Sequence, residues 1–493
     1  MRKFRKKLSA AFLSLSIASV SAVTFTAYAD VYNYDRRGSA VPSQAGYTAE
    51  KAVSGTDLGI SAFNSPSDIF CSSDNIFYIA DSGNDRIIAV DTEFEKVLEV
   101  YDSFIMPDGT ETALKKPMGV CVSAENGLMY IADTDNGRIL VADMDRNVKY
   151  EITKPETDVY DSKKTFLPQK VLVDKGGNIY AVLGNITTGA AMFSPEGEFT
   201  GFYGANRVEP TAEAVRNYFR GLLMSDEKKA RRARSVPSGI TNFDIDGDFI
   251  FTCTSSSGQT ADTVKKLNAA GINIFSDMEV TFGDYTPMYD TSQNKVMSSA
   301  FVDIDISENG NINCLDYTAG RIFQYDKDCD LLFIAGESSQ RLGGFDKSAA
   351  IESMGDRLFV VDSAKCTVTV FRETLFGNTV HKAVDLYNEG RYDEALEPWY
   401  EVLKRDGNYH FAHVGIASAL LRKGDYKGAM KYAKLAGDKK IYGKAFEGYR
   451  REFLGEYGGY IFAGAAVLAV AAVILRKRRK SGRKEKKAHD GLK

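Results

Sequence analysis

The chain has 493 residues, of which 44% are hydrophobic, 26% charged and 11% aromatic. This composition excludes disorder along the whole length, and the 26 Tyr, 29 Phe and 43 Gly residues favour a β-rich body with many turns over a long coiled coil. Residues 1–29 hold five basic groups and no acid, and residues 476–493 hold ten basic groups and two acids, which leaves 47 basic and 64 acidic side chains between them. An acidic body between basic ends argues against a nucleic-acid-binding protein.

Residues 1–29 have the pattern of a secretory signal peptide. A basic start is followed by an uncharged stretch from Leu8, and Ala27-Tyr28-Ala29 matches a small-residue cleavage site. We therefore expect export and a mature chain that begins at Asp30; the alternative is an uncleaved membrane anchor.

The chain has six Cys residues, an even number that would permit disulfides in an exported protein. They stand singly in apolar, strand-like runs, which favours buried free thiols. Cys314 with Cys329 is the one pair considered for a disulfide.

An internal repeat sets the expected fold. Tyr78–Ile87 and Tyr130–Ile139 match closely at an offset of 52 residues, and Asn313–Ile322 keeps the same Asp-to-Arg spacing. We count six units of about 50 residues, each with short apolar strands separated by turns, which is the pattern of a propeller blade. The last unit lacks a fourth strand, and the stretch near Glu50–Gly55 is expected to supply it and close the ring.

The Asp and Arg of this motif make the units resemble NHL repeats over about 310 residues. In that family the two residues mainly order a turn, so the resemblance implies a structural role, with ligand binding as the less favoured alternative. A short acid accepts turn N–H groups, and a guanidinium can bridge to a neighbouring blade. The residues concerned are Asp81, Arg86, Asp133, Arg138, Asp316 and Arg321.

An insertion interrupts the repeats at about residues 205–236. Its apolar residues are spaced as one helix face, and we expect a helical hairpin on one face of the propeller. A basic run follows, in which Arg231, Arg232 and Arg234 are candidate partner-binding residues. The run fits either a solvated face that pairs with nearby acids or a docking site for a partner or lipid headgroups.

Residues 377–456 are expected to be helical, with a repeat of their own. Gly390–Ala395 recurs 34 residues later as Gly424–Ala429, a period and pattern that resemble the tetratricopeptide (TPR) repeat. The resemblance implies a small groove for a peptide or protein, with Tyr392, Trp399 and Tyr426 as candidate binding residues. The alternative is a spacer that holds the propeller away from a membrane.

Residues 457–475 are the expected membrane span. These 19 residues carry no charge and would extend about 28 Å as a helix, enough to cross the hydrocarbon core. The basic tail, residues 476–493, should remain in the cytoplasm by the positive-inside rule. We therefore expect a single-pass cell-membrane protein whose body, residues 30–456, is extracellular.

The sequence shows no complete catalytic or metal-binding set. The four His residues, at 381, 410, 413 and 489, lie outside the six repeats, which removes His-ligated zinc and a His general base from the ring. Two acidic stretches, Asp244–Asp248 and Asp303–Asp305, could offer oxygen ligands to Ca²⁺. Six-bladed lactonases use such a site, but no full ligand set can be aligned here. We expect no cofactor, with Ca²⁺ as the alternative.

Together these features predict a mainly β protein, a six-bladed NHL-like propeller (residues 30–376), followed by a small all-α TPR-like segment and one transmembrane helix. The favoured function is non-enzymatic binding or scaffolding, with a protein partner at the outer side of the membrane. Exported proteins of this make-up resemble a bacterial surface family, which implies a role accessory to a transporter. The alternatives are a Ca²⁺-dependent propeller hydrolase or lactonase acting on a sugar derivative, and a structural spacer.

Overall fold

The computed structural model describes residues 31–35, 37–204, 239–255, 263–278, 280–285, 288–290 and 295–490. The expected signal peptide and the expected helical insertion, with Arg231, Arg232 and Arg234, lie outside the described residues. The chain forms two compact units, residues 1–33 with 40–377 and residues 34–39 with 378–493.

The first unit is a six-bladed β-propeller, as predicted, in which each blade is an antiparallel sheet. The first three blades are β4 (Asp68–Cys71), β5 (Phe77–Asp81), β6 (Arg86–Val90) and β7 (Val97–Tyr101); β10 (Pro117–Ser123), β11 (Leu128–Asp133), β12 (Arg138–Asp143) and β13 (Val148–Ile152); and β14 (Pro168–Val173), β15 (Ile179–Leu183), β16 (Ala190–Phe193) and β17 (Phe199–Tyr203).

The next three blades are β18 (Asn242–Asp246), β19 (Phe249–Cys253) and β20 (Val264–Leu267); β23 (Phe301–Ile306), β24 (Ile312–Asp316), β25 (Arg321–Tyr325) and β26 (Leu331–Ala335); and β29 (Ser348–Met354), β30 (Arg357–Asp362), β31 (Thr367–Glu373) and β3 (Tyr47–Val53). Short ribbons beside these sheets are β1 (Tyr32–Tyr34) with β2 (Ala40–Pro42), β8 (Ser103–Ile105) with β9 (Glu111–Ala113), β21 (Met288–Asp290) with β22 (Lys295–Met297), and β27 (Glu337–Ser338) with β28 (Gly344–Phe345).

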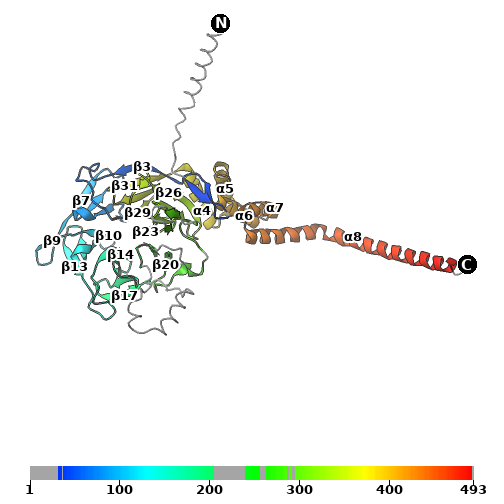
Figure 1. The fold of residues 1–493 in the computed structure, drawn as a ribbon, viewed down its shortest axis with the longest axis horizontal. Coiled ribbons are helices and arrows are strands. Elements are labelled where there is room, and N and C mark those ends of the chain that lie inside the picture. Colours follow the sequence, from blue (N-terminus) through cyan, green and yellow to red (C-terminus); the bar gives the residue numbers. More distant parts are fainter. Residues whose placement is uncertain are drawn as a thin grey trace, which may run out of the picture. The chain divides into compact units, whose positions relative to one another are not determined.

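The two ends of the propeller sequence share the sixth blade. Strand β3 pairs antiparallel with β31 from Tyr47 opposite Glu373 to Val53 opposite Val368, and Figure 1 shows blue β3 beside β31. The innermost strand of this blade, β29, contacts β4 of the first blade. The N-terminal strand therefore covers the outer edge of β31, which would otherwise be a free sheet edge at the end of the propeller sequence.

Apolar side chains fill the spaces between blades. At the join of the sixth and first blades, the ring of Phe359 lies 4.3 Å from that of Phe77 and 5.1 Å from that of Phe94. Val53, Ile69 and residues of β31 complete this cluster. Apolar packing between the blades therefore also holds the N-terminal strand to the last blade.

The second unit is helical. Five helices occur in the described part of the chain: α4 (Leu375–Asn388), α5 (Tyr392–Arg405), α6 (His410–Lys423), α7 (Tyr426–Ala436) and α8 (Lys439–Asp490). Helix α6 ends at Gly424, whose left-handed conformation (φ 83°) lets its N–H bond Leu420 and Leu421, and α7 begins with the Asp425 side chain accepting from the Gly428 N–H. Helix α8 is long and apolar enough to cross a membrane.

All six Cys residues are free thiols in this structure, including Cys314 and Cys329. Cys121, Cys253, Cys314 and Cys329 are buried, and Cys71 and Cys366 are half-buried. Burial raises the pKa of the Cys71 and Cys121 thiols to about 12, so both are poor nucleophiles at neutral pH.

Replacing Phe359 by Ala should destabilise the closed ring. The side chain is fully buried between Phe77 and Phe94, so its loss should lower the free energy of unfolding by about 3–5 kcal/mol. Denaturant unfolding followed by near-ultraviolet circular dichroism would measure the change. Leu98→Ala is the control, because Leu98 is 50% exposed on an outer strand; an equal effect of both changes would contradict this account of closure.

Candidate functional site

The six innermost strands place two layers of side chains around the central channel. In each blade one residue of the innermost strand pairs with the last or next-to-last residue of the second strand. These residues form the first channel layer: Asp68, Gly119, Lys170, Asn242, Asp303 and Ala350. The second channel layer lies two residues further along: Phe70, Cys121, Leu172, Asp244, Asp305 and Glu352. Polar residues therefore occupy most of the first layer, and acids occupy the second layer on blades four to six only.

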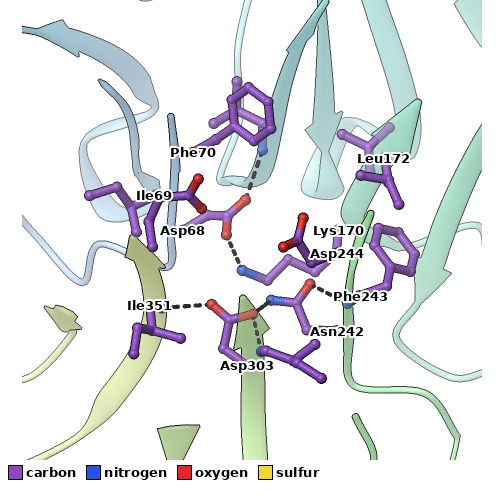
Figure 2. Close-up of a pocket in the computed structure, with 14 residues that line it drawn as sticks. Asp68, Ile69, Phe70, Lys170, Leu172, Asn242, Phe243, Asp244, Asp303 and Ile351 are labelled. Atoms are coloured by element: carbon purple, nitrogen blue, oxygen red, sulfur yellow. Dashed lines mark hydrogen bonds and ion pairs between the residues drawn. The ribbon is translucent and has the colours of Figure 1, made fainter. Parts of the chain in front are cut away.

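Lys170 is the cation of the channel. Its ammonium donates to the carboxylate of Asp68 and, at 3.1 Å, to the carbonyl of Ser67. Asp303 accepts from the Asn242 amide, and Figure 2 shows Lys170 extended across the channel between Asp68 and Asp303. Lys170, Asp68 and Asp303 are 8%, 7% and 3% exposed, so this charge network is shielded from solvent.

Carboxylates also join neighbouring blades by accepting backbone N–H groups. Asp68 accepts from Val120 (3.0 Å) and Asp303 from Ile351 (2.7 Å), in each case on the innermost strand of the next blade. The second layer repeats the arrangement: Asp244 with Ile306, Asp305 with Ser353, and Glu352 with Cys71. An innermost strand has a ladder partner on one side only, so these bonds satisfy N–H groups on its free edge.

Burial raises the pKa of all five channel carboxyls. For Asp68 and Asp303 the nearby Lys170 charge acts against burial, but the pKa still rises. For Asp244, burial and then the charge of Asp305 raise the pKa to about 8; for Glu352 the same two causes raise it well above its usual range. One ammonium cannot balance five carboxylates, which is consistent with a raised pKa at all five.

The channel has little free space beside these groups. The cavity lined by Asp68, Lys170, Asn242, Asp244 and Asp303 has a volume of about 30 Å³, which is room for about one or two water molecules rather than an organic substrate. Among the described residues, no group of three or more His, Cys, Asp or Glu side chains is arranged to hold a metal ion. The geometry accounts for blade pairing through the channel carboxyls, and the Ca²⁺ site considered for the acidic stretches stays a prediction.

The motif residues of the first two blades bond to the backbone of a turn and to each other. Asp81 accepts from the Asn64 N–H (2.7 Å) and from the Arg86 guanidinium (2.8 Å). Asp133 repeats both bonds with the Lys115 N–H and Arg138, each at 2.8 Å. Each pair thereby fixes the loop that enters its blade.

The fifth blade departs from this pattern. Asp316 accepts from the N–H groups of Ala300, Thr318 and Ala319, which is again a turn-ordering role. Arg321 instead pairs with Asp284 and lies over the Tyr32 ring at 5.0 Å. The Asp-to-Arg spacing alone therefore did not predict the partner of this arginine.

The helical residues singled out from the sequence fall in different environments. Tyr392 lies beside a surface pocket with Arg422 over its ring at 5.0 Å, and half-buried Tyr426 packs on Gly448 of α8. Trp399 is fully buried, and a Cβ at Gly415 would meet its ring at 2.4 Å. The expectation that Trp399 contacts a partner is therefore corrected: it fills the contact between α5 and α6.

Sequence reasoning noted Asp244, Asp303 and Asp305 as acidic stretches but missed Asp68, Lys170, Asn242 and Glu352. A signal was present, because Asp68 and Lys170 each stand two residues after the Pro that opens their unit. A charged residue at the same place in two inner strands indicates a shared environment.

Comparisons with known proteins give structural similarity only. No family model matches the chain, and no curated protein matches it. A virginiamycin B lyase from Staphylococcus aureus is 11% identical (TM-score 0.41), covering 66% of this chain and 100% of that chain. A streptogramin B lyase is 12% identical (TM-score 0.41; 67% and 100%), and a protein of unknown function from Bacteroides thetaiotaomicron is 11% identical (TM-score 0.39; 70% and 76%).

These neighbours correct one expectation. The chain was predicted not to be an enzyme, yet solved structures similar to it include lyases, so the exclusion of catalysis is withdrawn. At 11–12% identity the likeness assigns no reaction to this chain.

The channel acids predict that stability falls as pH rises. An unfolded Asp loses its proton near pH 4, whereas folded Asp244 keeps its proton until about pH 8 because burial raises its pKa. Between these values the folded state binds more protons and loses stability with increasing pH. Asp244→Asn should flatten this fall, measured by denaturant unfolding from about pH 5 to 9. Exposed Asp248→Asn is the control; a slope unchanged by Asp244→Asn would contradict the assignment.

Removing the channel cation should leave buried charge unpaired. Lys170→Met should lower the free energy of unfolding by about 3–5 kcal/mol, because Asp68 and Asp303 lose the ammonium of their network. Adding Asp68→Asn should restore part of that loss. A double-mutant cycle in denaturant would measure the coupling, and strictly additive losses would show that Lys170 and Asp68 do not act together.

Proposed function

We propose that this chain is an exported, single-span membrane protein that binds a protein partner outside the cell through its helical unit, with the propeller as a second recognition surface. The observation that carries the proposal is the contrast between two cavities. The channel cavity of about 30 Å³ is filled by paired polar groups, whereas a surface pocket of about 270 Å³ opens on the helical unit.

The pocket on the helical unit has the chemistry of a protein-binding site. It is lined by Gly390–Glu394 at the start of α5 and by Arg422 and Lys423 at the end of α6. An aromatic ring under a guanidinium, with carboxylates on the rim, suits a short polar segment that carries charges of both signs. Its Tyr392 was one of the residues selected from the sequence.

The membrane anchor is supported by the exposed apolar surface of α8. Tyr460, Phe462 and Leu468 are 79%, 80% and 72% exposed, and apolar area of this size is unfavourable in water. Arg476–Lys480 follow the apolar segment immediately, and the positive-inside rule then assigns the tail to the cytoplasm and the two units to the outside.

The test is partner capture on intact cells with a membrane-impermeant amine cross-linker, followed by purification of the full chain and quantitative mass spectrometry. We expect a stoichiometric partner with the unchanged protein and about tenfold less with Tyr392→Ala/Arg422→Ala, because both central pocket side chains are lost. Glu397→Ala, exposed on the same helix outside the pocket, should leave capture unchanged. Equal recovery with all three proteins would refute the proposed site, and cross-linking only after cell lysis would refute the proposed orientation.

A further inference from the structure

One face of α8 carries a strip of aromatic side chains just before its apolar segment. Their spacing of three or four residues places them on one side of the helix; the members of this aromatic strip are Tyr442, Phe446, Tyr449 and Phe453. The same side of the helix continues with Tyr457 and Tyr460 at the start of the apolar segment. The Phe453 ring lies 6.1 Å from that of Tyr449 and 5.1 Å from that of Tyr457, so the strip is continuous there. Tyr442, Phe446 and Phe453 are 41%, 48% and 40% exposed.

The strip lies beside the face that holds α8 against α7. Ala445 is fully buried, and a Cβ at Gly448 would meet the Tyr426 ring at 2.3 Å, so these small residues take the main contact with the preceding helix. Tyr449 also meets α7, because the Lys427 ammonium lies over its ring at 5.5 Å. Tyr442, Phe446 and Phe453 remain exposed and are open to another surface.

The surroundings of the strip are basic. Residues 426–454 hold eight Lys or Arg and three Asp or Glu side chains. Lys444, Arg450 and Arg451 are exposed on the same part of α8. Aromatic residues flanked by Lys and Arg are the combination that binds the headgroup region of an anionic lipid surface.

Three glycines lie where the strip gives way to the apolar segment, and none of them is required by packing. A Cβ at Gly455, Gly458 or Gly459 would meet no atom within 4 Å among the described residues. Glycine has the lowest helix propensity apart from proline, and helices bend where such residues cluster. These positions are therefore suited to a change of helix direction at the membrane surface.

We propose that the strip Tyr442–Phe453 is a lipid-binding face that lies on the extracellular surface of the membrane. Gly455–Gly459 form the hinge between this face and the membrane span. The inference rests on the proposed membrane anchor. In an upright, straight helix Phe446 would stand about 16 Å above Tyr457, well outside a headgroup layer of about 5–7 Å. Lipid contact at Phe446 therefore distinguishes a helix that lies on the surface from one that stands upright.

The experiment uses the full chain in nanodiscs that contain phosphatidylglycerol and phosphatidylcholine with brominated acyl chains, which quench nearby tryptophan. Three single variants report position: Phe446→Trp in the strip, Lys444→Trp on the opposite side of the same turn, and Phe462→Trp in the span. The native Trp399 is fully buried in the helical unit and contributes the same background to each. We expect strong quenching at 462, at least about twofold more quenching at 446 than at 444, and less at 446 in discs without phosphatidylglycerol.

The hinge is tested by Gly455→Ala/Gly458→Ala/Gly459→Ala, which stiffens the helix and keeps its apolar character. In that background quenching at 446 should fall to the level of 444, and unchanged quenching would overturn the hinge. Absence of quenching at 462 would refute the anchor itself. Quenching at 462 with none at 446 would overturn the lipid-binding face alone. Blue-shifted but unquenched tryptophan emission from the Phe446→Trp variant would also overturn it, because the propeller or a second copy would then cover the strip.

Discussion

The propeller depends on how it satisfies the backbone N–H groups on the channel side of its innermost strands. Each of these strands has a ladder partner on one side only, and an unpaired buried N–H costs about as much as a lost hydrogen bond. Carboxylates of the preceding blade accept from five of these groups. Of these bonds, that between Glu352 and Cys71 joins the first blade to the sixth, which β3 completes. The ring is therefore held closed by hydrogen bonds in the channel as well as by apolar packing between the blades.

This solution concentrates acids where water is scarce. Five carboxyls share one ammonium, and burial raises the pKa of each of them. The acids of the second layer belong to the last three blades, while Phe70, Cys121 and Leu172 occupy the same layer in the first three. The six units share a backbone arrangement but differ in the side chains that they place in the channel. The repeat therefore determines the ring, and the individual side chains determine which groups in the channel can titrate.

The sequence allowed prediction of whatever depends on local pattern. The 52-residue offset and the Asp at the end of the second strand predicted the blades and their turns, because each turn acid contacts a backbone N–H only 17 or 18 residues away in the sequence. The channel layers depend instead on register across blades. An irregularity near the start of β10, β14, β23 and β29 shifts the pairing by one residue, and only ring closure brings Asp68 to Lys170, 102 residues away. The prediction that Trp399 contacts a partner was wrong because its ring packs against Gly415, where the absence of a side chain makes room for it.

Charge changes sign along the helical unit in a way that bears on its function. Residues 378–406 hold seven acids and four bases, whereas residues 422–454 hold four acids and ten bases. The basic end adjoins the apolar segment in sequence, where an anionic lipid surface would attract it, and the acidic end is the part that such a surface would repel. The pocket around Tyr392 lies between these two halves, with Asp393 and Glu394 on one rim and Arg422 and Lys423 on the other. A helical unit held through its basic end would leave this mixed-charge pocket accessible from the aqueous side, where a protein partner could reach it.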